Sequence, residues 1–169
     1  STSDKHALHI TDDKNETLAL AKTLLNNNTL NFLRSKRKQE TPNFVNLMNN
    51  LKMNNSDHAN FVIAGSGPLA AFGLRDCSDL DYLKVDGDLG LSHLNIHSHD
   101  HEQHWYPLSA KEIIEHPQNY FFYQGIKFVD LDIIRHMKEN RRETKDIVDL
   151  RLINSVPERP FNVRHQLTK

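Results

Sequence analysis

Two acidic residues separated by one apolar residue, Asp79 and Asp81, are the side chains of this chain best suited to chemistry. On a strand, residues two apart lie on one face, roughly 7 Å apart along the chain, so both carboxylates can point at one divalent cation or a pair. Carboxylate oxygens are the ligands that Mg²⁺ prefers, usually beside substrate phosphates. The spacing therefore favours Asp79 and Asp81 as catalytic metal ligands. The alternative is a solvated polar face of an ordinary half-buried strand.

The residues before the acids predict the elements that must position them. The run from Phe61 to Leu83 indicates a short apolar strand, a Gly65-Ser66 turn, a helix of small residues and a second strand that carries the acids. Backbone N–H groups at a turn that begins a helix are unpaired and suit phosphate oxygens.

This order of residues resembles the signature of the polymerase-β-type nucleotidyltransferase superfamily. Gly65-Ser66 is followed, after twelve residues, by Asp79-Leu80-Asp81. The resemblance implies a mixed-sheet α/β (α+β) fold flanked by helices, and Mg²⁺-dependent transfer of a nucleotide monophosphate from a nucleoside triphosphate such as ATP to an acceptor hydroxyl. It implies Asp79 and Asp81 as catalytic metal ligands, with one Mg²⁺ or two. It also implies that the backbone N–H groups of the Gly65-Ser66 turn approach the phosphates of the nucleotide. The acceptor stays open among a sugar, an RNA and a protein.

A second resemblance involves the residues from Gly125 to Ile153. They predict a strand and two helical runs, and their order of Lys138, Arg142, Lys145-Asp146 and Asp149 is similar to the C-terminal motif of nucleotidyltransferases related to abortive-infection toxins. It is also similar to short nucleotidyltransferase-like proteins of bacterial surface-polysaccharide gene clusters. The resemblance implies that Lys138 and Arg142, which share a helix face at i, i+4 spacing, bind the triphosphate. The alternative is a solvated charged face.

A third carboxylate, which the superfamily normally supplies from a neighbouring strand, has no clear counterpart. The expected neighbouring strand, residues 91–98, holds Asn95 or His97 where an acid is sought. The remaining candidates are single acids outside that strand: Asp100, Asp130 and Asp132. Asp130 and Asp132 are equally explained as helix-capping or first-turn acids. A second hypothesis is therefore an inactive nucleotidyltransferase-fold module for binding or assembly, associated with bacterial surface-polysaccharide modification.

Five histidines between His93 and His104 raise a third hypothesis, a Zn²⁺ or Ni²⁺ site formed by His97, His99 and His101. A solvated polar loop is the simpler interpretation of the same segment.

Composition limits the classes of protein. The chain has 169 residues, a net charge of −1 and one cysteine, which predicts one domain, no internal disulfide and no dedicated duplex-DNA surface. It has no long apolar stretch and no visible secretory signal, so we expect no membrane span and a cytoplasmic location. Because it starts at Ser1, we expect a processed or tagged N-terminus or excision from a longer chain.

Periodicity and turn signals divide the chain into three parts. We expect an N-terminal helical segment over residues 1–57, a nucleotidyltransferase-like core over 58–155 and an irregular arm over 156–169. Within the core, the run from Tyr120 to Val129 predicts a hairpin. Ser109 with Glu112 predicts a capped helix start.

Overall fold

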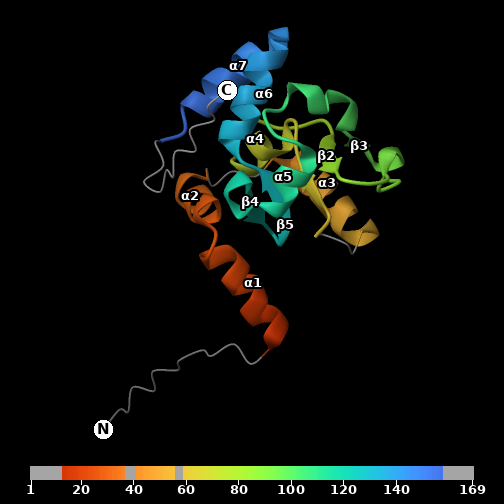
Figure 1. The fold of residues 1–169 in the computed structure, drawn as a ribbon, viewed down its shortest axis with the longest axis vertical. Helices are drawn as coiled ribbons and strands as arrows, with labels where there is room; N and C mark the ends of the chain where they lie inside the picture. The colour runs from red at the N-terminus through yellow and green to blue at the C-terminus, as the bar shows by residue number, and fades with distance from the viewer. Residues whose placement is uncertain (1–12, 37–40, 56–58, 158–169) are drawn as a thin grey trace.

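The computed structural model describes residues 13–36, 41–55 and 59–157. Of the irregular arm expected over 156–169, only residues 156 and 157 lie within the described part. The described chain is a mixed α/β fold with helices around one sheet, which confirms the fold class expected from the sequence (Figure 1).

The sheet has five strands in the order β3-β2-β1-β5-β4. The strands are β1 (Phe61–Ile63), β2 (Leu80–Lys84), β3 (Ile96–Ser98), β4 (Tyr120–Tyr123) and β5 (Ile126–Val129). β1 runs antiparallel to β2 and parallel to β5, whereas β2 and β3 are parallel and β4 and β5 are antiparallel. The start of β2 and the ends of β1 and β5 therefore lie at the same end of the sheet.

The helices are α1 (Lys14–Leu24), α2 (Asn27–Ser35), α3 (Pro42–Asn54), α4 (Gly67–Ala71), α5 (Ala110–Glu115), α6 (Leu131–Arg141) and α7 (Thr144–Asn154). Three short 3₁₀ segments are η1 (Ser92–Leu94), η2 (Asp100–Trp105) and η3 (Pro117–Asn119). None of the helices in residues 13–36, 41–55 and 59–157 has both the length and the apolar character needed to cross a membrane.

Local signals account for several of these boundaries. Gln124 and Gly125 both have positive φ, which is the backbone of a tight two-residue hairpin turn between β4 and β5. Ser109 and Glu112 form a reciprocal capping box at the start of α5. The hairpin and the capped helix expected from the sequence are therefore confirmed.

The expected strand over residues 91–98 is wrong in its first half. Asn95 adopts φ 59, a left-handed conformation that a strand residue does not have, and the residues before it form η1. Only Ile96–Ser98 pair with β2. The kink at Asn95 sets the register in which His97 stands beside Asp81.

The core has two sides. On one, aromatic rings from α2, α3 and α4 pack with rings of β4 and β5, namely Phe32, Phe44, Phe72, Phe121 and Phe128. On the other, Lys127 points away from Phe128 and donates to the backbone oxygen of Ile114 at the end of α5. β5 thus has packed side chains on both faces.

The start of α2 lies along β4, the outermost strand on its side of the sheet. The Thr29 hydroxyl accepts a hydrogen bond from the backbone N–H of Phe122 (2.9 Å), and the buried Asn26 amide donates to the backbone oxygen of Tyr120 (3.2 Å). Side chains of the helical segment therefore satisfy backbone groups of the edge strand.

Candidate functional site

The Gly65 bend and the Asp81 carboxylate are in direct contact. The backbone N–H of Ala64 donates to the carbonyl of Asp81 (2.8 Å), and Gly65 then turns the chain with φ +55. A Cβ built on Gly65 would lie 2.1 Å from Asp81 Oδ2. Only glycine fits this position, because a side chain would displace the acid and the φ value is one that L residues rarely adopt. The two halves of the expected motif are therefore adjacent.

Asp79 lies just before β2, half-buried, where its Oδ1 accepts a hydrogen bond from the Ser78 hydroxyl (3.2 Å). Burial, and then the charge of Asp79, raise the pKa of Asp81 to about 6. His97 and the cations Lys145 and Arg141 act in the opposite direction on the same pKa. Two acids that repel each other in a part-buried site form a place where a cation is favourable.

The Gly65-Ser66 turn offers fewer free donors than expected. The backbone N–H of Gly65 donates to the Tyr106 hydroxyl (3.3 Å), so it is already satisfied within the protein. Ser66 is half-buried at the start of α4, and its side chain makes no capping hydrogen bond to that helix. Of the two, Ser66 is the residue available to a ligand.

Two further residues lie near the acids: Tyr106, which the sequence did not single out, and His99, which it offered as a Zn²⁺ or Ni²⁺ ligand. Tyr106 is buried after η2, with its hydroxyl 3.0 Å from His99 Nδ1. The other nitrogen, His99 Nε2, is 4.0 Å from Asp81 Oδ2. Burial lowers the pKa of His99 to about 4, so the ring is neutral near pH 7. The signal in the sequence, a histidine cluster one strand from the acids, pointed to metal binding instead.

His97 occupies the position on β3 in register with Asp81. The candidate third acids lie in other arrangements. The Asp100 side chain accepts from the Ser98 hydroxyl (2.6 Å), Asp130 caps α6, and Asp132 forms an ion pair with Arg135 (3.1 Å). The helix-cap interpretation of Asp130 is therefore confirmed, and the strand beside Asp81 presents an imidazole rather than a carboxylate.

A metal enclosed by protein side chains alone does not fit this site. Across the described part of the chain, no three His, Cys, Asp or Glu side chains are arranged to hold an ion. That statement covers the trio His97, His99 and His101 as well as the acids. A donor set of two neighbouring carboxylates does fit Mg²⁺ that arrives with a nucleotide, because such Mg²⁺ takes its other ligands from phosphates and water.

Lys138 and Arg142, which the sequence places on one helix face, lie in different surroundings. Lys138 is only 2 % exposed, and its ammonium lies 3.1 Å from Asp146 Oδ1 and 2.7 Å from Asp149 Oδ2 on α7. Arg142 is an exposed residue beyond α6, with φ 59. Asp146 and Asp149, which the sequence could place on a solvated helix face, are buried and form ion pairs with Lys138.

Of Lys138, Arg141 and Arg142, it is Arg141 whose charge contributes to lowering the pKa of Asp81. Its guanidinium lies 2.8 Å from Asp146 Oδ1 and 3.7 Å from Glu102 Oε2, with the side chain 7 % exposed. It acts on the pKa of both Asp81 and His99. The helical spacing gave no reason to single out Arg141.

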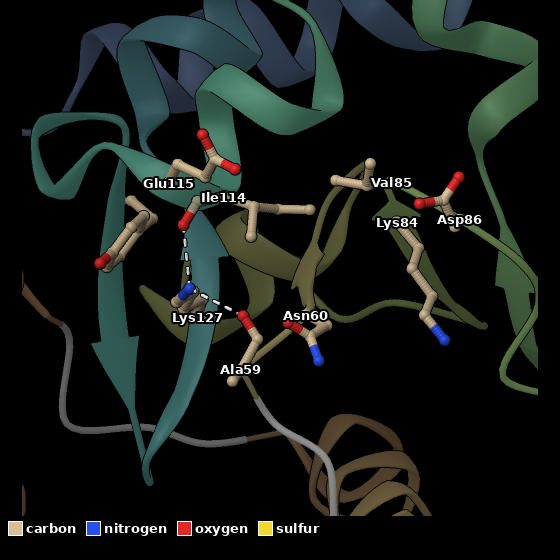
Figure 2. Close-up of a pocket in the computed structure, with 9 residues that line it drawn as sticks. Ala59, Asn60, Lys84, Val85, Asp86, Ile114, Glu115 and Lys127 are labelled. Carbon is tan, nitrogen blue, oxygen red and sulfur yellow. Dashed lines mark hydrogen bonds between the residues drawn. The ribbon is translucent and has the colours of Figure 1, made fainter.

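A pocket of about 520 Å³ lies away from the acids, at the other end of the β1–β2 pair (Figure 2). Its wall includes Asn60 before β1 and Lys84 at the end of β2. Lys127 crosses it and donates to the backbone oxygens of Ala59 (2.8 Å) and Ile114 (2.9 Å). Lys127, one of the two lysines that line the pocket, is therefore engaged in hydrogen bonds within the protein. The pocket shares no residue with the acid site.

Comparison of the chain with protein-family models, with curated proteins and with solved structures found no match.

Proposed function

We propose that the chain is a Mg²⁺-dependent nucleotidyltransferase that moves a nucleotide monophosphate from a nucleoside triphosphate to an acceptor hydroxyl. The observation that carries this proposal is the contact between Asp81 Oδ2 and the Gly65 bend, with Asp79 alongside. It brings the paired carboxylates to the backbone turn that begins α4. When bound with the nucleotide, Mg²⁺ would supply charge neutralisation at the phosphates, held by Asp79 and Asp81.

The chemistry requires a balanced displacement. The acceptor oxygen bonds to the α-phosphorus, the bond from that phosphorus to the bridging oxygen breaks, and pyrophosphate leaves. The hydroxyl proton must pass to a base. His97, in register with Asp81 on β3, is our candidate, because imidazole is the commonest general base in enzymes. Arg141 contributes positive charge, which acts to lower the pKa of Asp81. Positioning and electrostatics supply most of the rate in such transfers.

The test is a double substitution, Asp79→Asn plus Asp81→Asn, assayed for pyrophosphate release with each of ATP, CTP, GTP and UTP in the presence of Mg²⁺ and candidate sugar, RNA and protein acceptors. We expect the variant to lose turnover while remaining folded. The matched control is Asp86→Asn plus Asp88→Asn, an acid pair of the same spacing beyond the other end of β2. Turnover retained by the first variant would remove the proposal.

A second candidate is a module that binds nucleotide without turning it over. Three observations favour it: Lys138 is used up in ion pairs, the Gly65 N–H is satisfied by Tyr106, and β3 offers no acid beside Asp81. Calorimetry with the four triphosphates separates the two. Mg²⁺-dependent binding with no pyrophosphate release under any acceptor supports the module, whereas release in the wild-type protein excludes it.

A further inference from the structure

The buried groups behind Asp81 form a chain of donors and acceptors whose directions can be worked out. Tyr106 Oη accepts the backbone N–H of Gly65 at 3.3 Å and lies 3.0 Å from His99 Nδ1. A phenol has one hydrogen to donate. Among the described residues, His99 Nδ1 is the other atom within hydrogen-bond distance of this buried hydroxyl, so it is the acceptor to which the phenol hydrogen can be donated. His99 Nδ1 is therefore an acceptor.

An imidazole that accepts at Nδ1 carries its hydrogen on Nε2 when it is neutral. His99 Nε2 lies 4.0 Å from Asp81 Oδ2. That separation is too long for a hydrogen bond but places an N–H group toward the carboxylate. Contacts of this kind in ligand-free sites are often long and shorten when substrate binds.

We propose that His99 and Tyr106 are positioning residues that fix the Asp81 carboxylate against the Gly65 bend. When a nucleotide binds, the Nε2–H of His99 comes within hydrogen-bond distance of Oδ2 and holds it on the protein side, so that Oδ1 is the oxygen left for the cation of the nucleotide. This role rests on the proposed function of Asp81. Neither residue touches the reacting atoms. Their effect passes through Asp81, as hydrogen-bonding partners behind metal ligands do in other sites.

The same row of hydrogen-bonding groups fixes the position of the Gly65 bend. His99 and Tyr106 flank η2 and Gly65 follows β1, so two segments distant in sequence meet at the acid. All three residues are buried, which means that the hydrogen bonds cannot be replaced by water without cost. A shift of one segment would move both the acid and the turn.

The first measurement uses the wild-type protein. Nitrogen-15 NMR of histidine-labelled protein reports the tautomer of each neutral ring. We expect His99 to have its hydrogen on Nε2, and Asp81→Asn to shift the Nε2 resonance. A hydrogen on Nδ1 would overturn the proposal whether or not the protein binds a nucleotide. This readout therefore separates failure of the positioning chain from failure of the proposed function.

The second measurement compares two conservative variants by calorimetry with the Mg²⁺-nucleoside triphosphate that the wild type binds best. His99→Gln can place an amide N–H near the Nε2 position, whereas His99→Asn keeps an acceptor near Nδ1 but has no donor to reach Asp81. We expect binding to weaken about tenfold or more in His99→Asn and to be largely retained in His99→Gln, the size seen for partners behind metal ligands. Equal weakening by both variants would assign His99 to packing alone and overturn the proposal.

The matched control is His104→Asn, which changes an exposed histidine on η2 whose Nδ1 lies 3.1 Å from the His101 carbonyl oxygen. It should leave binding and the His99 tautomer unchanged. Tyr106→Phe removes the phenol hydrogen and should shift the His99 ring toward the other tautomer. An unchanged His99 tautomer in the Tyr106→Phe protein would also count against the proposed row of hydrogen bonds.

Discussion

Replacing Lys138 with methionine tests whether this residue holds the fold together or contacts a nucleotide. Methionine keeps the length and apolar stem of lysine but removes the charge that lies between Asp146 and Asp149. Removing one partner of a buried ion pair costs about 3–5 kcal/mol, because a charge stays buried without its counterion. Here each aspartate keeps one arginine, Arg141 for Asp146 and Arg75 for Asp149. We therefore expect the lower end, about 3 kcal/mol.

The assay is urea and thermal unfolding at pH 7, with Lys145→Met as the matched control. Lys145 is 65 % exposed and pairs with Glu143 at 3.0 Å, so its loss should cost about 0–1 kcal/mol. A loss of 3 kcal/mol lowers the melting temperature of a domain of this size by about 6–12 °C. If the free energy of unfolding of Lys138→Met lies within 1 kcal/mol of that of Lys145→Met, the reasoning is refuted and Lys138 is again a candidate nucleotide contact.

The pH dependence gives a further check. Burial acts to raise the pKa of Asp146, but the hydrogen bonds and charges of Arg141 and Lys138 outweigh it and lower that pKa to about 2. The stability that Asp146 contributes is therefore present above its unfolded pKa of about 4, and is lost as the pH falls toward about 2. The difference in the free energy of unfolding between the wild type and Lys138→Met should become smaller as the pH falls over the same interval.

The remaining predictions concern the acid site. Gly65→Ala should abolish Mg²⁺-nucleotide binding and destabilise the fold by about 1–3 kcal/mol in urea unfolding, because its Cβ would meet Asp81 Oδ2; Gly87→Ala, also at positive φ but with open space around it, should leave binding intact. Asp81→Asn should raise the free energy of unfolding by about 1–3 kcal/mol at pH 8 and little at pH 4. The reason is that the pKa of Asp81 is raised to about 6, so the stability of its protonated form is lost as the pH rises through that value. An Asp81→Asn protein less stable than wild type at pH 8 would contradict this.

The parts of the site that sequence could predict depend on local rules. Asp81 stands on β2 with Asp79 just before it, near where the alternation in the sequence placed them, and Gly65 stands where a turn needs positive φ. The hairpin turn at Gln124-Gly125 and the capping box at Ser109 follow from turn and cap chemistry in the same way.

The parts that sequence could not predict depend on contacts between distant segments. Helical spacing alone pairs Lys138 with Arg142, but the fate of Lys138 is decided by two acids of the next helix that are buried with it. Likewise, no local pattern links Tyr106 to Gly65, forty-one residues earlier, or His99 to Asp81. The left-handed residue Asn95, which a period-2 pattern passes over, shortens the strand and sets its register.

The hydrogen bonds from the start of α2 to β4 have a consequence for self-association. An edge strand with unpaired backbone groups is a template for joining another chain, and proteins commonly protect such edges with other segments. Asn26 and Thr29 saturate part of that edge from within the same molecule. Losing those two side chains should therefore promote intermolecular sheet and aggregation, even where Asp79 and Asp81 are untouched.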